Sequence, residues 1–257
     1  MRLPSLYVFS GAGLSAESGL ATFRGNGGLW QQSDMSQVLT YSDWKAQRPR
    51  VFEFFGALLA QVAQARPNPA HRQLAAWQAR WGPERVRLFT QNVDDLLERA
   101  GASAVTHLHG DLATLLCTAC ATQWAPGAGY GETARCPKCN SLRGVKPGVV
   151  FFGEPAPRYR EMDRALEGLT AGDILLVVGT SFEVLPVERL VPLPCKGAER
   201  AVLVDLAPKQ ADWFGTVHAG PAGQTLPELD EPLTRWMVHA FEGPAWPLRR
   251  RPRRLRA

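Results

Sequence analysis

The sequence predicts an α/β protein with an open, doubly wound parallel sheet and a smaller domain inserted into it. Three observations indicate this fold class. Short apolar runs with the length of buried strands recur along the chain, amphipathic helical patterns separate several of them, and a glycine turn follows the first run. Strands that alternate with helices favour a parallel sheet, because parallel neighbours need a long crossover connection.

Five apolar runs are expected to form the sheet. Each is short and rich in Val, Leu, Ile or Phe, as strands buried on both faces are. In chain order they are SLYVFS (5–10), VRLFTQN (86–92), VTHLHG (105–110), DILLVVGTS (173–181) and AVLVDLA (201–207).

Helices are expected between these strands and near the end of the chain. The stretch NVDDLLERAG (92–101) ends at Gly101, a residue type that commonly follows the last helical turn. Amphipathic spacing predicts a second helix over 157–173, and a last helix is expected near 227–241.

Two regions do not fit the sheet and are expected to form the smaller domain. Residues 34–81 are mainly helical in pattern, with 49–64 as the clearest helix, and 117–144 are rich in glycine, cysteine and proline. The expected division is a large domain of 1–33, 82–115 and 145–245, a small domain of 34–81 and 116–144, and a basic tail of 246–257.

Four cysteines in two Cys-x-x-Cys pairs predict a structural zinc site. Cys117 and Cys120 are separated from Cys136 and Cys139 by the spacing of a zinc ribbon, in which two knuckles supply four thiolates to one Zn²⁺ ion. Four sulfur ligands leave no open coordination position, so catalysis by the metal is not expected. Disulfides or redox thiols are the alternatives, and an expected cytoplasmic location disfavours disulfides.

The formal net charge of +5 comes from the end of the chain. The tail LRRRPRRLRA carries six arginines, without which the net charge would be −1. A basic tail is able to contact nucleic acid, although a disordered, solvated end is the expected state. No apolar run is long enough to span a membrane and no signal-peptide pattern opens the chain, so we expect a cytoplasmic protein.

Polar or glycine residues follow all five predicted strands, where doubly wound sheets bind their ligands. The first turn, Gly11-x-Gly13-x-x-Ala16, is typical of a Rossmann-like dinucleotide site, and a second glycine turn begins at Gly179. The stretch after the first turn is rich in glycine and lacks the second strand of the ordinary motif. We therefore expect a Rossmann-like sheet that binds a dinucleotide in an unusual way.

A histidine pair follows the third predicted strand. His107 and His109 are two residues apart on an extended segment, which predicts that both point to the same side. Asn92 and Asp94 follow a neighbouring strand and are expected at the same site. Histidine titrates near neutrality and is the usual acceptor of a proton from a hydroxyl, so this cluster predicts general-base catalysis.

A set of motifs in fixed order resembles the sirtuins, which are NAD-dependent protein-lysine deacylases. The resemblance covers roughly residues 5–240. Its motifs are GAGLSAESGLATFRGNGGLW (11–30), TQNVDDL (90–96), HLHGDL (107–112), the four-cysteine segment, KPGVVFFGE (146–154), VVGTSFEVLP (177–186) and GPAGQTLPEL (220–229).

The resemblance implies that NAD binds between a Rossmann-like large domain and the smaller domain, and it suggests which residues hold it. The pyrophosphate turn would be Gly11, Ala12, Gly13 and Ser15; the cofactor loop and its approach Glu17, Thr22, Phe23, Arg24 and Trp30; the nicotinamide side Gln91, Asn92 and Asp94; and the adenosine side Gly179, Thr180, Ser181, Asp205, Leu206 and Ala222.

The resemblance also implies the reaction. The acyl oxygen of the substrate lysine attacks the nicotinamide ribose, nicotinamide leaves, and His109 as general base takes a proton through the ribose hydroxyls, with Asn92 and Asp94 beside it. Water then completes the release of lysine and O-acyl-ADP-ribose. The strand that pairs with the acyl-lysine peptide would be Val149, Phe151, Phe152, Gly153 and Glu154.

The acyl pocket departs from that of family members that prefer succinyl or malonyl lysine. Those members hold the acyl carboxylate with a Tyr-x-x-Arg pair, whereas Phe55 and Leu58 stand at these positions here. An apolar pocket disfavours a buried carboxylate. The expected substrates are therefore proteins that carry acetyl or other apolar acyl groups on lysine, and desuccinylation is expected to be poor.

Two other functions would use the same NAD site. One is mono-ADP-ribosyl transfer or NAD hydrolysis, against which the intact KPGVVFFGE stretch (146–154) argues. The other is a non-enzymatic NAD sensor that recruits nucleic acid through the basic tail, in which His109 and Asn92 would be dispensable.

Overall fold

The computed structural model describes residues 3–21 and 39–239, and its main element is a six-stranded parallel sheet. The strands lie in the order β3-β2-β1-β7-β8-β9, which is the order of dinucleotide-binding Rossmann sheets. The predicted fold class is confirmed. The strands are β1 (Leu6–Ser10), β2 (Val86–Thr90), β3 (Val105–His107), β7 (Ile174–Val178), β8 (Ala201–Asp205) and β9 (Thr216–Ala219).

The strand order reverses between β1 and β7. Leu6 of β1 lies opposite Val86 of β2 on one side and opposite Ile174 of β7 on the other, and both pairings are parallel. A crevice forms at such a reversal, beyond the carboxyl ends of the strands. The two glycine turns follow β1 and β7, so the topology brings them to this crevice.

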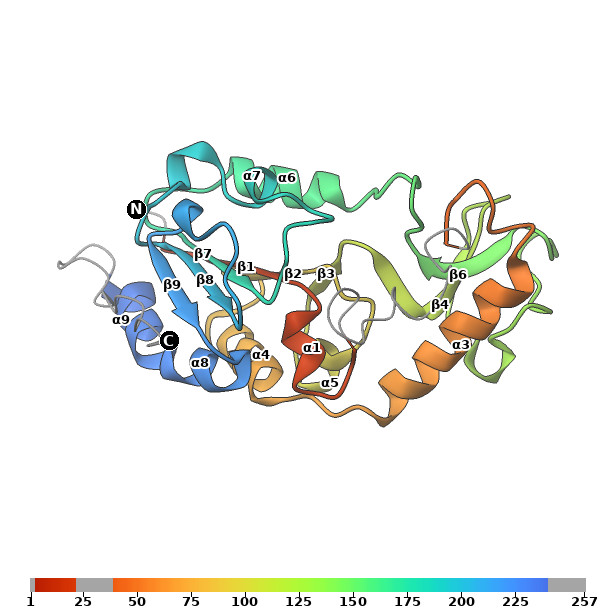
Figure 1. Cartoon of the computed structure of the whole chain (residues 1–257), viewed down its shortest axis with the longest axis horizontal. Helices are drawn as coiled ribbons and strands as arrows, with labels where there is room; N and C mark the ends of the chain where they lie inside the picture. Colours follow the sequence, from red (N-terminus) through yellow and green to blue (C-terminus); the bar gives the residue numbers. More distant parts are fainter. Residues whose placement is uncertain (1–2, 22–38, 240–257) are drawn as a thin grey trace, which may run out of the picture.

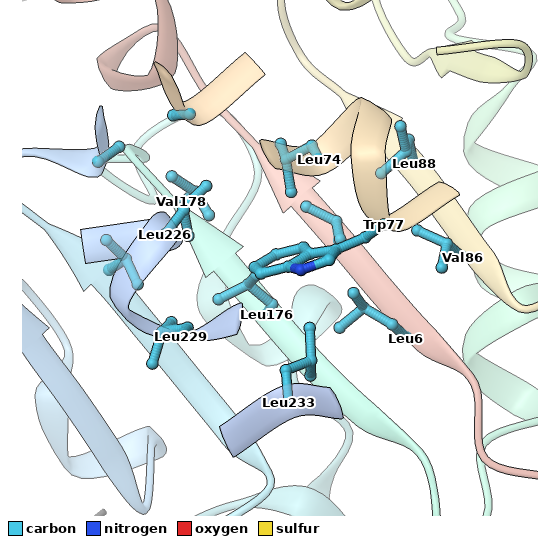
Figure 2. Close-up of a cluster of buried hydrophobic side chains, with 14 of the residues drawn as sticks. Leu6, Leu74, Trp77, Val86, Leu88, Leu176, Val178, Leu226, Leu229 and Leu233 are labelled. Carbon is cyan, nitrogen blue, oxygen red and sulfur yellow. The ribbon is translucent and has the colours of Figure 1, made fainter. Parts of the chain in front are cut away.

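Helices cover both faces of the sheet (Figure 1). Trp77 lies at the centre of one layer, among Leu6, Leu176 and Leu233 from three different elements (Figure 2). Its ring N–H donates to Asp230 over 2.7 Å, so the buried nitrogen is paired. One face carries α6 (Tyr159–Glu167) and α7 (Val187–Leu190), and the other carries α4 (Pro69–Trp81), α8 (Ala222–Glu228) and α9 (Asp230–His239).

A second, antiparallel sheet lies at the opposite end of the molecule from β9 (Figure 1). Its order is β5-β4-β6, with β4 (Gly110–Cys117), β5 (Gln123–Trp124) and β6 (Val145–Val149). Helix α3 (Arg48–Gln64) packs against it, because Phe52 shares an apolar cluster with residues of β4 and β6. The remaining helices are the short α1 (Gly13–Ala16) and α5 (Leu96–Arg99), with 3-10 turns at Gly127–Gly129, Leu193–Cys195 and Ala211–Trp213.

The division into two domains remains a proposal, and two observations argue for changes to it. Strands β4 and β6 pair in the antiparallel sheet, whereas the predicted division put 110–115 and 145–149 in the large domain. Ala70, Leu74 and Trp77 of α4 belong to the apolar cluster that covers the six-stranded sheet. Helix α3, by contrast, packs with the antiparallel sheet. We therefore propose that residues 69–81 belong to the large domain and not to the small one.

Two predicted helices are shorter than expected. The helix predicted over 92–101 is reduced to α5, because the backbone N–H groups of Asn92 and Leu96 donate to the side chains of Thr90 and Asp94 instead of entering a helix. The helix predicted over 157–173 is α6, which ends before Gly168.

The sequence did not predict β4, β5 or β9, and the run predicted over 105–110 is divided. The strand expected at 149–154 from the resemblance instead lies at Val145–Val149, as β6. Gly110 has φ +87° and starts β4, and a Cβ there would collide with the Gly148 carbonyl. The close contact between these strands therefore needs glycine at this position. In the described residues no helix combines the length and apolar character that crossing a membrane requires.

Candidate active site

A cavity of about 620 Å³ lies at the carboxyl ends of β1, β2, β7 and β8. Helix α3, the stretch that follows β6, and the starts of α6 and α8 also contribute to its wall. It brings together most of the predicted site residues. Those that line it are Gly11, Ala12, Gly13, Glu17, Phe55, Gln91, Asn92, His109, Val149, Phe151, Phe152, Gly153, Glu154, Gly179, Thr180, Ser181, Asp205, Leu206 and Ala222.

Three predicted site residues do not line this cavity. Leu58 is buried in the apolar cluster between α3 and β6, and Ser15 and Asp94 lie behind the cavity wall. The predicted cofactor-loop residues Thr22, Phe23, Arg24 and Trp30 lie outside the described residues.

The two glycine turns pack backbone to backbone at the bottom of the crevice. A Cβ on Gly11 would lie 2.7 Å from the Gly179 carbonyl oxygen, and a Cβ on Gly13 would lie 2.6 Å from the Gly179 Cα. Side chains at these positions would therefore separate the turns. Backbone this close, at the carboxyl edge of the sheet, suits the approach of a pyrophosphate.

Two acidic residues, Glu17 and Asp205, line this crevice. The Glu17 carboxylate accepts from the Gly223 N–H over 2.7 Å, which ties the segment after α1 to α8. Asp205 ends β8 and lines the cavity, where its carboxylate accepts from the Ala207 N–H over 2.8 Å. Burial raises the pKa of Asp205 above its ordinary value. The glycine turns and the acidic residues around the cavity fit the binding of NAD.

A buried polar network lies behind the cavity and orients Asn92. The Ser15 hydroxyl donates to Asp94 over 2.9 Å and accepts from the Asn92 amide over 3.0 Å. His71 accepts from the Asn68 N–H through Nδ1, so its Nε2 carries the proton and faces the Ser15 hydroxyl at 3.4 Å. Burial raises the pKa of Asp94 and lowers that of His71 to about 4. The Asn92 amide is thus fixed by Ser15, whose hydroxyl is itself hydrogen-bonded to Asp94.

His109 lines the cavity in a defined tautomer. Its Nδ1 lies 2.9 Å from the Gln91 carbonyl oxygen, which only accepts hydrogen bonds, so Nδ1 carries the proton. The lone pair of the neutral ring is therefore on Nε2, which lies 2.7 Å from the Tyr159 hydroxyl. Burial lowers the pKa of His109, so the ring is neutral near pH 7, as a general base requires.

His107 does not line this cavity, although it lies only two residues before His109. Strand β3 ends at His107, and Leu108 is buried before the chain reaches His109. The His107 ring contacts the Asn92 carbonyl at 2.9 Å and Glu98 at 2.8 Å. Although burial alone would lower the pKa of His107, the hydrogen bond and charge of Glu98 raise it.

The predicted substrate strand is anchored by a buried ion pair. Lys146 Nζ lies 3.0 Å from the Glu154 carboxylate, and its side chain is 1% exposed. Glu154 also accepts from the Phe151 N–H over 2.9 Å. Burial lowers the pKa of Lys146, against the attraction of Glu154. The ion pair ties the stretch that follows β6 to Lys146 of β6, and the Phe151 contact closes a turn within that stretch.

The cavity wall near this strand is aromatic. Phe55 of α3 stacks on Phe151 with ring centroids 5.8 Å apart, and Phe54 packs against Phe55 at 5.1 Å. Arg48, about two turns earlier in α3, donates instead to the backbone carbonyls of Val145 and Glu132. In the described residues this part of the wall is apolar.

The four predicted cysteine ligands come together as expected. Their Sγ atoms all lie within 4.8 Å of one another, with Cys117 3.6 Å from Cys139 and Cys120 3.5 Å from Cys136. Sulfurs about 2.3 Å from a tetrahedral zinc ion lie about 3.8 Å apart, so the geometry fits Zn²⁺. Cys195 is not among them and is buried in the apolar cluster on one face of the six-stranded sheet.

Several residues of the site were missed from the sequence. Tyr159 was placed in a predicted helix without a role, and Phe54 was overlooked beside Phe55. His71 lies in PNPAH (67–71), to which the sequence analysis gave no role. A histidine next to an Asn-Pro helix start was the available signal for His71, whereas nothing in the sequence pairs Tyr159 with His109.

The fold and the cavity define a class: Rossmann-like nucleotide-binding proteins with a four-cysteine zinc site and a half-buried histidine in the cavity wall. The family model described as "Sir2 family" matches residues 11–186. The chain belongs to the Sir2 family, the sirtuins.

Relatives and solved structures agree with this assignment. The chain is 35% identical to an NAD-dependent protein deacylase of Helicobacter hepaticus, over 92% of this chain and 100% of that protein. It is 38% identical to NAD-dependent protein deacylase 2 of Archaeoglobus fulgidus, over 89% of this chain and 90% of that one. A crystal structure of a Sir2 homologue in complex with NAD superposes with a TM-score of 0.76 and 31% identity, covering 92% and 91% of the two chains.

Proposed function

We propose that this protein is an NAD-dependent protein-lysine deacylase that removes acetyl or other apolar acyl groups. One observation carries the proposal: a single cavity holds the packed glycine turns of β1 and β7, the neutral base His109, and the aromatic wall beside the predicted substrate strand. Relatives named as NAD-dependent protein deacylases support it.

In this proposal, one set of predicted residues binds NAD and His109 acts as the base. Bound NAD supplies an electrophilic ribose carbon and nicotinamide as its leaving group. Gly11, Gly13 and Gly179 would hold the pyrophosphate, and Asn92 would orient the nicotinamide side from its buried network. His109 accepts a proton at Nε2 because Nδ1 is already bound to the Gln91 carbonyl.

The aromatic wall supports a preference for apolar acyl groups. Phe55 and Phe151 offer no partner to an acyl carboxylate, and Lys146, 4.1 Å from the Phe151 ring centroid, is neutralised by Glu154. An unpaired carboxylate in such a pocket is disfavoured by several kcal/mol. We therefore infer that succinyl and malonyl lysine are poor substrates.

A panel of acyl-lysine peptides tests the proposal. With NAD, the wild type should form O-acyl-ADP-ribose from acetyl, propionyl and longer apolar peptides, and little from succinyl peptide. His109→Ala should lose about 10²- to 10⁴-fold in rate while still binding NAD. The matched control His107→Gln alters a histidine outside the cavity and should stay within tenfold of the wild type.

The alternative functions give different results in the same assay. Nicotinamide that accumulates without O-acyl-ADP-ribose would favour NAD hydrolysis or ADP-ribosyl transfer. NAD binding without release of nicotinamide, in the wild type and in His109→Ala alike, would favour an NAD sensor. Contact with nucleic acid through the tail 246–257, outside the described residues, stays a prediction, which loss of salt-dependent DNA retention on deleting the tail would support.

A further inference from the structure

Tyr159, the first residue of α6, is bound directly to the proposed base. Its hydroxyl oxygen lies 2.7 Å from Nε2 of His109, and the two ring centroids are 5.8 Å apart. Because Nδ1 of the neutral ring carries the proton, Nε2 can only accept, and the tyrosine hydroxyl is the donor. The lone pair that the reaction needs is therefore occupied in this structure.

Tyr159 is held in this position by its other neighbours. The Arg189 guanidinium of α7 lies 4.6 Å from the centre of the Tyr159 ring, and it binds both carboxylate oxygens of Asp163, one turn further along α6, over 3.1 and 2.8 Å. A cation on the face of the ring stabilises this orientation. The hydroxyl therefore has a defined place at the cavity wall.

The charges around the pair leave both groups neutral. The described contacts of the His109 ring are the Gln91 carbonyl and the Tyr159 hydroxyl, while the charged pair of Arg189 and Asp163 faces the tyrosine. Burial raises the pKa of Tyr159, against the attraction of Arg189. The phenol thus keeps the proton that it donates.

We propose that Tyr159 is a positioning residue for the base: it caps Nε2 of His109 in the free protein, fixes the ring in one orientation and tautomer, and is displaced when a substrate hydroxyl binds. The inference rests on the proposed function. Nε2 has one lone pair and cannot accept from Tyr159 and from a substrate hydroxyl together. Once the cap has moved, the substrate O–H bond breaks, its proton bonds to Nε2, and the oxygen keeps the electron pair.

Removing the hydroxyl gives a direct test in the free protein. The hydrogen bond from Tyr159 stabilises neutral His109, so Tyr159→Phe should raise the His109 pKa by about half to one pH unit. The measurement is the titration of histidine Cε1–H signals by NMR, with His109 assigned through His109→Gln. Tyr130→Phe, which removes a buried hydroxyl in the zinc module, should leave this pKa unchanged.

Kinetics separate a displaceable cap from a fixed partner. The pH profile of kcat/KM reports the free enzyme and that of kcat reports the complex. Tyr159→Phe should move the acid limb of kcat/KM to higher pH and leave the limb of kcat in place. Arg189→Met, which loosens the ring without removing the hydroxyl, should move the kcat/KM limb in the same direction by less.

Two results would overturn the inference. An unchanged His109 pKa in Tyr159→Phe would mean that the hydroxyl does not bind Nε2 in solution. A fall in kcat as large as that of His109→Ala would mean that Tyr159 stays in the complex and passes the proton itself. Because the NMR titration needs no turnover, a shifted pKa in a protein without deacylase activity would refute the proposed function and not the cap.

Discussion

The position of Asn92 in the site depends on the protonation state of one buried residue, His71. It is fully buried, accepts from the Asn68 N–H, and faces Ser15, which in turn holds Asn92. A proton on Nδ1 would point at the Asn68 N–H and break this contact. The network behind the cavity therefore needs His71 neutral.

This requirement predicts an acid-sensitive fold. The pKa of His71 is lowered by burial from 6.5 to about 4, so between these values the unfolded chain binds a proton that the folded protein does not. The contribution of His71 to the free energy of unfolding is fully present above pH 6.5. It should fall by about 3 kcal/mol as the pH drops to 4. Urea unfolding at a series of pH values measures the loss.

A variant assigns this loss to the residue. In His71→Gln the stability at neutral pH should be lower, but the decline from His71 between pH 6.5 and 4 should be absent. His107→Gln removes a histidine with a raised pKa and should keep that decline. An equal decline in His71→Gln and the wild type would contradict the prediction.

At the scale of elements, the zinc module has little apolar core of its own. Its buried cluster consists of Leu115 and Val145 from the antiparallel sheet, Phe52 from α3, and the ligands Cys117 and Cys136. Arg48 links the same helix to the module through the carbonyls of Val145 and Glu132. With so few apolar groups, the metal supplies much of the local stability.

Removing zinc should therefore loosen one part of the protein. After chelation, amide hydrogen exchange should rise over 110–149, in β4, β5 and β6, and stay slow in β1 and β7. Cys139→Ser should lower the zinc content below one per chain and give the same exchange pattern, whereas Cys195→Ala should keep one zinc. Faster exchange throughout the six-stranded sheet would show that the module is not an independent unit.

At the scale of the whole molecule, the cavity connects the two sheets. Its lining runs from the strand ends of the parallel sheet to Phe55 of α3 and to Val149 at the end of β6. A ligand that contacts all of these walls binds the folded arrangement and not the unfolded chain. Binding is therefore coupled to the stability of the whole fold.

NAD should raise the melting temperature of the wild type. At a hundred times its Kd a ligand adds about 2.7 kcal/mol, which for a protein of this size corresponds to roughly 5–10 °C. Thermal unfolding at increasing NAD concentration measures the shift, with nicotinamide alone as the ligand control. A melting temperature that does not change with NAD would argue against the cavity as its site.

The sequence by itself determined five of the six strands of the parallel sheet, the zinc ligands and most of the cavity lining. Apolar runs such as 174–178 and the two Cys-x-x-Cys pairs are local signals, because burial and metal binding select residue types at fixed spacing. The glycine turns were equally visible, since backbone packing against Gly179 excludes any side chain at Gly11.

Only the tertiary structure decided which of these residues meet. In the structure His109 lines the cavity and His107 does not, and Leu58 and Asp94 lie outside the cavity lining. Helix α4 packs on the six-stranded sheet. The tertiary structure also brought Tyr159 to His109 across fifty positions of the chain. Such contacts depend on how helices and turns pack in three dimensions, and no spacing along the chain encodes them.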